Sequence, residues 1–142
     1  MSFFDFSDEV ERAVEQAPDD AARLSAKTAV HRANLPAAVR RAGFRYLPSG
    51  GPFSPGDDDL VIGVAAWSDP DLAALEDLVL TARSSPVQVT VFDIDELSFP
   101  EMVELLPGMH RFMHTPVVIH YRRGGIIYFG EGNDAVLWLR QL

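Results

Sequence analysis

Four histidines are the side chains in this sequence best suited to bind a metal ion or to move a proton. They are His31, His110, His114 and His120. His110 and His114 are four residues apart, a spacing that would place two ligands on one face of a helix. Pro107-Gly108 and Thr115-Pro116 bracket this pair, so a sustained helix is not expected, and no third ligand accompanies it. We therefore expect exposed loop histidines here, with no metal bound.

Two acidic clusters could hold calcium or magnesium through their carboxylates. Asp57-Asp58-Asp59 forms one cluster, and Asp93, Asp95 and Glu96 form the other. Neither has the spacing of a calcium loop, which needs a central glycine and a closing glutamate. Since charge clusters usually need no ligand, we expect solvated loop carboxylates in both places and predict no cofactor.

Nucleophilic catalysis has little support in the sequence. The chain has no cysteine, which excludes disulfides, zinc–thiolate sites and every thiol mechanism. It has no Gly-x-Ser-x-Gly motif, and no Ser/His/Asp triad can be assembled by motif. Ser68 stands before Asp69-Pro70 at a predicted helix start, where a hydroxyl either caps the helix or binds an anion. We expect the cap and predict no catalytic residue.

The composition is that of a single globular domain with a short appendage. With 142 residues, 47% hydrophobic and 23% charged, the chain can bury one sizeable core. No apolar run reaches the ~18 residues needed to cross a bilayer, and the N-terminus lacks the pattern of a secretory signal. The 12 Lys and Arg against 21 Asp and Glu give a net charge of −9, which argues against DNA or RNA as the main partner. We expect a cytoplasmic protein that binds no membrane.

Residues 60–142 alternate between strand and helix patterns. The continuous apolar run from Leu60 to Trp67 is typical of a strand buried on both faces, and Ser68-Asp69-Pro70 then begins a helix. The order predicted after this helix is a strand at 87–91, a short helix at 101–106, a hairpin of strands at 117–121 and 126–129, and a helix capped by Asn133. A strand–helix–strand unit requires a parallel crossover, and the hairpin adds antiparallel strands. The prediction is an α/β fold with a mixed sheet of four to five strands flanked by helices.

Residues 1–59 are predicted to form a helical arm and linker, separate from a domain of residues 60–142. Ser7 is the expected cap of a first helix that Pro18 ends, and a second helix covers roughly residues 20–32. Asn34 is expected to cap a third helix with Pro36 in its first turn, ending at Gly43. Residues 44–47 could form a short edge strand, and the turn formers that follow mark the linker.

The arm holds a basic stretch, because residues 21–56 contain no acidic side chain. Its six basic residues are Arg23, Lys27, Arg32, Arg40, Arg41 and Arg45. They could face a partner, or they could pair with the acidic body of the same chain, which the opposite charges favour. Both interpretations stay open at this point.

Residues 60–142 resemble the thioredoxin superfamily in four features. These are an apolar strand ending in Trp67 before a helix with Pro70, a Phe-Asp-Ile-Asp exit from the second strand, Thr115-Pro116 before the third, and a hairpin with Gly124-Gly125 followed by Gly130. Thioredoxins have Trp-Cys-Gly-Pro-Cys where this sequence has Trp67-Ser68-Asp69-Pro70-Asp71. A serine hydroxyl cannot exchange with a disulfide and an aspartate cannot resolve one, so thiol–disulfide oxidoreductase activity is excluded.

The resemblance implies a thioredoxin-like fold with an N-terminal helical extension and a peptide-binding groove. It implies that Pro116 is cis and faces the helix start, the alternative being an ordinary trans proline at a strand start. The residues expected to line the groove are Trp67, Ser68, Asp69, Pro70, Asp71, Thr115 and Pro116. An extended peptide would pair there with the main chain like an added strand, which requires no thiol.

The function expected from this resemblance is that of a redox-inert protein that binds another protein or peptide as a chaperone, assembly factor or complex subunit. The sequence is also similar to the cysteine-less hydrogenase-accessory chaperones of the superfamily, in size, at Ala42-Gly43-Phe44 and at Ser68-Asp69-Pro70. Two alternatives stay open: an enzyme that holds glutathione or another small anion at Ser68, and a structural module that forms a homodimer through the arm.

Overall fold

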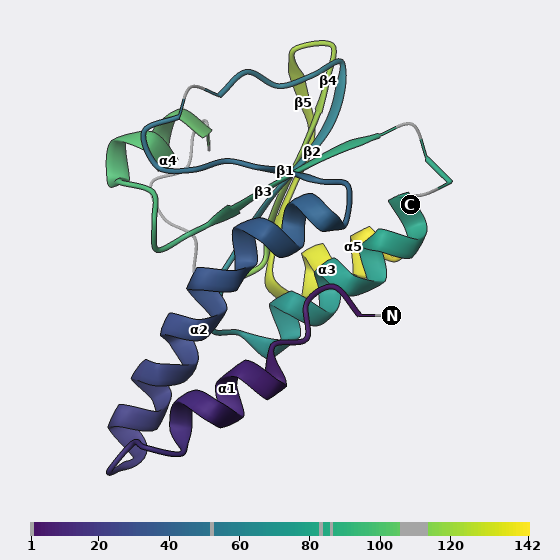
Figure 1. Ribbon diagram of the computed structural model, residues 1–142. Coiled ribbons are helices and arrows are strands. Elements are labelled where there is room, and N and C mark those ends of the chain that lie inside the picture. Colours follow the sequence, from purple (N-terminus) through teal and green to yellow (C-terminus); the bar gives the residue numbers. More distant parts are fainter. Residues whose placement is uncertain (1, 52, 83, 86, 106–113) are drawn as a thin grey trace.

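In the computed structural model, which describes residues 2–51, 53–82, 84–85, 87–105 and 114–142, a five-stranded mixed sheet is flanked by helices (Figure 1). The strands are β1 (Arg45–Tyr46), β2 (Asp58–Val64), β3 (Gln88–Asp93), β4 (Val117–Arg122) and β5 (Gly125–Glu131). The helices are α1 (Ser7–Val14), α2 (Asp20–Arg41), α3 (Asp69–Ala82), α4 (Phe99–Leu105) and α5 (Gly132–Leu139). Strands β1, β3 and β2 are parallel and β4 and β5 antiparallel, in the order β1-β3-β2-β4-β5. The predicted thioredoxin-like α/β fold with an N-terminal helical extension is confirmed.

The sheet separates two hydrophobic cores, one on each face. The larger core lies against α2, α3 and α5 and buries Leu35, Leu75 and Leu139. The smaller core includes Phe92 of β3 and Leu105 of α4. Strand β2 contributes to both cores, and its residues after Asp58 are buried, as the continuous apolar run predicts. None of the helices in the described ranges has the length and apolar character needed to cross a membrane.

Helix α2 is one continuous helix, so the prediction of two helices separated near Asn34 is wrong. Pro36 lies inside it, and Asn34 does not cap a new helix but donates its side-chain N–H to the Val30 carbonyl at 2.8 Å. Proline removes one helical hydrogen bond at such a position. The face of α2 that carries Leu35 and Val39 is completely buried in the larger core, and this burial keeps the helix intact across the proline.

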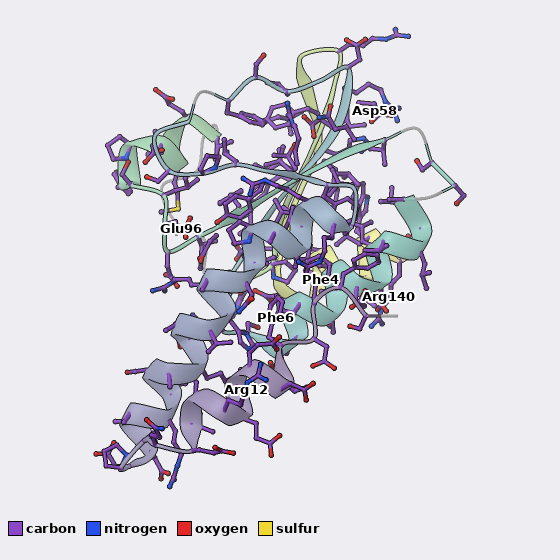
Figure 2. The ribbon with its side chains drawn as sticks, in the orientation of Figure 1. Phe4, Phe6, Arg12, Asp58, Glu96 and Arg140 are labelled. Carbon is purple, nitrogen blue, oxygen red and sulfur yellow. The ribbon has the colours of Figure 1, made fainter. Side chains whose placement is uncertain are left out.

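The packing also runs across the expected boundary between residues 59 and 60. Phe4 and Phe6 are buried in the larger core, and the N–H groups of Phe3 and Phe4 donate to Glu76 Oε1 of α3 at 2.8 and 3.0 Å (Figure 2 shows Phe4 and Phe6 beside the helices). Strand β2 begins at Asp58, within the expected linker, and the expected edge strand is β1. The division of the chain into arm and domain stays a prediction, but the two parts share one core.

Three helix starts differ from those expected. Ser7 is not the N-cap of α1, because Phe6 holds that position and the Asp5 side chain accepts from the Ser7 N–H at 3.0 Å. Helix α4 begins at Phe99 rather than at residue 101, and α5 begins at Gly132 instead of after an Asn133 cap. Each start differs by no more than one helical turn from the expected residue, and a sequence pattern does not define a helix boundary more closely than this.

The turn between β4 and β5 closes the hairpin that the sequence predicts. Arg123 and Gly124 have φ angles of 52° and 79°, so both central residues are left-handed, as in a two-residue type I′ hairpin. The Arg123 N–H also donates to the Asp57 carbonyl at 2.8 Å, which ties the turn to the chain before β2. The hairpin fixes β5 as an edge strand.

Candidate functional site

The connection from β2 to α3 carries the first half of the expected binding surface. Ser68 caps α3: its carbonyl accepts from the Leu72 N–H at 3.1 Å and its Oγ from the Asp71 N–H at 3.4 Å. Pro70 follows in the first turn, where a helix does not need the missing N–H. The cap predicted at Ser68 is confirmed. The side chains exposed on this connection are those of Trp67, Asp69 and Pro70.

The segment before β4 supplies the second half. Strand β4 is the antiparallel neighbour of β2, with Val117 opposite Gly63, so β4 begins at the end of the sheet at which β2 finishes. Thr115 and Pro116 stand at this end of the sheet, and the peptide bond between them is cis. Thr115 is half-buried and Pro116 is buried. We call the residues Trp67, Ser68, Asp69, Pro70, Thr115 and Pro116 together the Trp67–Thr115 surface.

Asp71 lies in the interior, between the two halves of the Trp67–Thr115 surface, and does not line that surface. Its residue exposure is 1%, and its Oδ2 accepts from the Ala65 N–H at 2.9 Å. The side chains of Thr115 and Ser68 also hydrogen-bond to its carboxylate. Burial raises the pKa of Asp71 and the three hydrogen bonds work in the opposite direction. Of the seven expected groove residues, Asp71 therefore faces inward, and Pro116 is buried as well.

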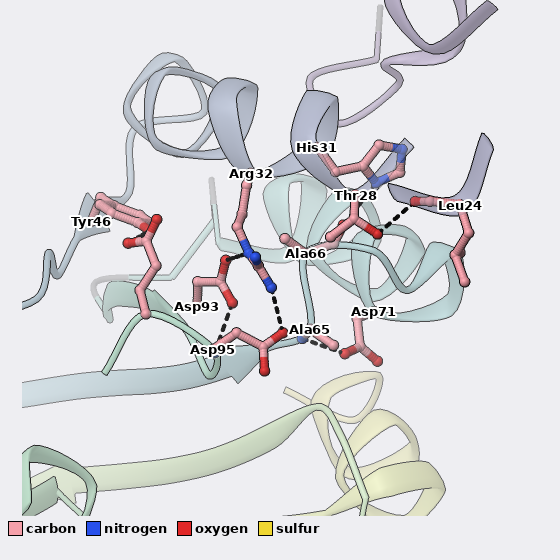
Figure 3. A network of polar contacts seen from close by, with 11 residues as sticks. Leu24, Thr28, His31, Arg32, Tyr46, Ala65, Ala66, Asp71, Asp93 and Asp95 are labelled. Atoms are coloured by element: carbon pink, nitrogen blue, oxygen red, sulfur yellow. Dashed lines mark hydrogen bonds and ion pairs between the residues drawn. The ribbon is translucent and has the colours of Figure 1, made fainter. Parts of the chain in front are cut away.

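Helix α2 contacts the same connection from the side (Figure 3). The Nδ1 atom of the buried His31 lies 2.7 Å from the Ala66 carbonyl, and Lys27 Nζ lies 2.9 Å from Asp69 Oδ2. Leu24, one turn before Lys27 and Thr28, is 61% exposed. The expected arm thus stands beside the Trp67–Thr115 surface and fixes the backbone of its first half.

Most of the basic residues of the arm contact groups in the same chain. Arg32 and Lys27 pair with acids of the body, and Arg45 pairs with the buried Asp59 at 2.9 Å. The remaining contacts are Arg23 with Asp20 at 2.7 Å and Arg40 over the ring of Tyr46. Arg41 is exposed. These pairs compensate much of the arm's charge internally, so that its expected role toward a partner stays a proposal.

The acidic clusters are only in part the solvated carboxylates that we expected: Asp57 and Asp95 are exposed, but one member of each cluster is not. Asp59 and Asp93 are buried. Asp59 accepts hydrogen bonds from Arg45, from the Thr90 hydroxyl and from the Gly56 N–H. Burial also raises the pKa of Asp93, against the attraction of Arg32. The prediction failed because both carboxylates found partners far away in the sequence, which no local pattern reveals. Across the described ranges, no three His, Asp or Glu side chains are grouped to hold a metal ion.

The histidines divide into buried and exposed ones. His31 and His120 are buried, and His120 Nε2 pairs with Asp58 Oδ1. His114 is exposed, as expected, whereas His110 lies outside the described residues. No pair of histidines among the described residues shares a site.

Sequence reasoning missed Gly132, which holds the second half of the surface in place. Its N–H donates to the Pro116 carbonyl at 2.9 Å, and its φ is 63°. A Cβ atom on Gly132 would lie 2.8 Å from the Cβ of His114. The signal available in the sequence was a glycine directly before the polar residues of a predicted helix start.

Replacing Gly132 by alanine is expected to lower the free energy of unfolding by about 1–3 kcal/mol, because alanine resists a positive φ and would press on His114. Urea unfolding measures the loss, and NMR reports any shift of the Thr115 amide. Gly124→Ala is the matched control, since Gly124 has a φ of 79° but no atom within 4 Å of the position that a Cβ would take. Equal losses and an unmoved Thr115 signal would show that Gly132 has no special contact with this segment.

The known proteins that match this chain are all solved structures. No protein-family model and no curated protein matches the sequence. A mutant thioredoxin from Halobacterium salinarum NRC-1 is 18% identical, with a TM-score of 0.47 over 68% of this chain and 89% of that one. ERdj5 form II is 21% identical, with a TM-score of 0.44 over 73% of this chain, and full-length ERdj5 is 18% identical, with a TM-score of 0.44 over 85% of it. The chain spans only 14% and 15% of those two ERdj5 chains.

Proposed function

We propose that this thioredoxin-like protein binds an extended segment of another polypeptide at the Trp67–Thr115 surface and acts as a redox-inert chaperone, assembly factor or complex subunit. The observation that carries the proposal is the position of Thr115. It directly precedes β4 and the cis bond to Pro116, at the end of the sheet where β2 leads to the exposed Trp67. Main-chain groups beside a large exposed apolar side chain are what the pairing of an extended chain uses.

The chemistry of this surface favours chain binding over catalysis. The sequence has no cysteine, and the hydroxyl of Ser68 is engaged with Asp71. Trp67 is 47% exposed, although a tryptophan gains most when its ring is covered. Partly exposed tryptophans frequently anchor interfaces, with backbone pairing supplying the remaining affinity.

The glutathione-binding alternative is less well supported by the same geometry. An anion at the α3 N-terminus would share the Ser68 hydroxyl with the cap and would lie close to the buried carboxylate of Asp71. Like charges at short range repel each other, which disfavours an anion there. The dimer alternative also loses support, because the face of α2 that carries Leu35 and Val39 is used by the protein's own core.

Trp67→Ala and Thr115→Arg are each expected to weaken the capture of an unfolded polypeptide by about tenfold or more, because the first removes the apolar anchor and the second places a bulky charged side chain where the bound chain would lie. Reduced, carboxymethylated α-lactalbumin, which cannot refold, is a suitable probe in a binding titration. Circular dichroism should be unchanged in both variants.

Leu80→Ala is the matched control, since Leu80 is a large apolar side chain that is 70% exposed on α3. It should bind the probe like the natural protein. If neither variant of the surface alters the affinity, or if Leu80→Ala weakens it equally, the Trp67–Thr115 surface is not the binding site.

A further inference from the structure

We infer that Asp71 is a positioning residue: its buried carboxylate holds the two halves of the Trp67–Thr115 surface at a fixed distance from each other. The inference rests on the function proposed above, to which it adds the device that shapes the site. Asp71 would not contact the bound chain, because it lies beneath the exposed side chains with 1% of its surface accessible.

The hydrogen bonds of Asp71 come from both halves of the surface. On the first half, the Ala65 N–H donates to Oδ2 at 2.9 Å and the Ser68 side chain also bonds to the carboxylate. On the second half, the donor is the side chain of Thr115. One carboxylate therefore fixes the end of β2, the cap of α3 and the segment before β4. Figure 3 shows the hydrogen bond between Asp71 and Ala65.

The position of Asp71 in α3 explains how it reaches so far. It is the third residue after the cap, and in a capping box the side chain at this position turns back to the N–H of the cap residue. Here the backbone half of that motif is present, because the Asp71 N–H donates to Ser68 Oγ. The carboxylate instead extends past the cap to Ala65 and Thr115. It thus joins segments that local helix capping does not require to meet.

Burying a carboxylate also costs free energy, because burial disfavours its charged form. Burial raises the pKa of Asp71, so the folded state holds its proton more tightly than the unfolded state does. The stability contributed by this group therefore falls as the pH rises from the unfolded pKa through the raised folded pKa, and at neutral pH ionisation disfavours folding. An amide of the same shape would avoid this cost.

Asp71→Asn is the variant that separates positioning from stability. It keeps the size of the side chain but replaces one of two acceptor oxygens with a donor, so it cannot accept from both Ala65 and Thr115 in the same way. We expect about tenfold weaker binding of carboxymethylated α-lactalbumin, equivalent to one charge-assisted hydrogen bond, together with an unchanged or raised melting temperature. If Asp71 had only a structural role, Asp71→Asn would lower both the affinity for the probe and the melting temperature, or the melting temperature alone.

Two controls complete the test. Asp77→Asn makes the same chemical change at an exposed position of α3 and should alter neither quantity. Thr115→Val removes the hydroxyl that reaches Asp71, and its effect on binding should largely disappear in the Asp71→Asn background, because both changes break one link.

Specific results would overturn the inference. It fails if Asp71→Asn binds the probe normally, if affinity and melting temperature fall together, or if the effects of Asp71→Asn and Thr115→Val simply add. NMR without any ligand distinguishes this failure from that of the proposed function. If the natural protein does not bind the probe but Asp71→Asn shifts the Ala65 and Thr115 amide signals, the link exists and the proposed function is wrong. If these signals do not move, Asp71 positions nothing.

Discussion

A chain that lacks residues 1–56 is expected to lose cooperative folding and to expose apolar surface. The deletion removes β1 and α2 together with buried side chains of the larger core: Phe4, Phe6, Leu35, Ala38, Val39 and Phe44. Burying one large apolar side chain stabilises a fold by about 1.5–3 kcal/mol. Because a domain is stable by only about 5–15 kcal/mol in total, losing this set exceeds the margin.

Thermal unfolding and solubility measure the outcome, and single substitutions show that the core contacts are its cause. Leu35→Ala, at a fully buried position of α2, should cost about 2–5 kcal/mol, whereas Leu24→Ala on the exposed part of the same helix should change little. A shortened chain that stays soluble and melts at the temperature of the complete one would contradict this prediction. It would restore the interpretation of residues 1–59 as an independent arm.

Phe92→Ala is expected to cost about 3–5 kcal/mol, among the largest effects that a single substitution can have in this protein. Phe92 belongs to the smaller core and is the largest of the fully buried side chains among the described residues. It lies opposite Gly63 on the neighbouring strand β2, and a Cβ atom on Gly63 would come within 2.4 Å of its ring. The ring thus fills the space that a side chain on β2 would otherwise take, next to the end of β2 that leads to Trp67.

Gly63→Ala provides the matched test of this packing. Alone it should also destabilise the protein, because the ring of Phe92 must move. In the Phe92→Ala background it should cost far less, since the methyl group then enters the vacated space. Urea unfolding of the four proteins gives the coupling free energy. Simple additivity of the two losses would mean that the contact between Gly63 and Phe92 does not control the smaller core.

The sequence was sufficient where the cause of a structure is local. The continuous apolar run of β2, the cap at Ser68 and the hairpin of β4 and β5 each depend on residues that are neighbours in the chain. The absence of cysteine excludes thiol chemistry without any coordinates. The alternation of strand and helix patterns predicted the mixed sheet and its flanking helices, and the resemblance to the thioredoxin superfamily implied the region of the candidate surface.

Other features could be decided only by contacts between distant parts of the chain. Pro36 predicts a helix break, but burial of Leu35 and Val39 against the sheet keeps α2 continuous. The charges of Asp59 and Asp93 predict solvated loops, but each lies buried opposite an arginine from the expected arm. In each case the free energy of tertiary burial and pairing exceeds the local preference.

Asp71 shows the same division within the candidate site. The sequence by itself determined that no sulfur occupies this position and that a helix begins just before it. Only the folded sheet decided that its carboxylate meets Ala65 and Thr115, because the antiparallel pairing of β2 with β4 brings the end of β2 and the start of β4 to the same end of the sheet. Pairing between strands depends on the registration of remote residues, and a single sequence does not encode that registration in any local pattern.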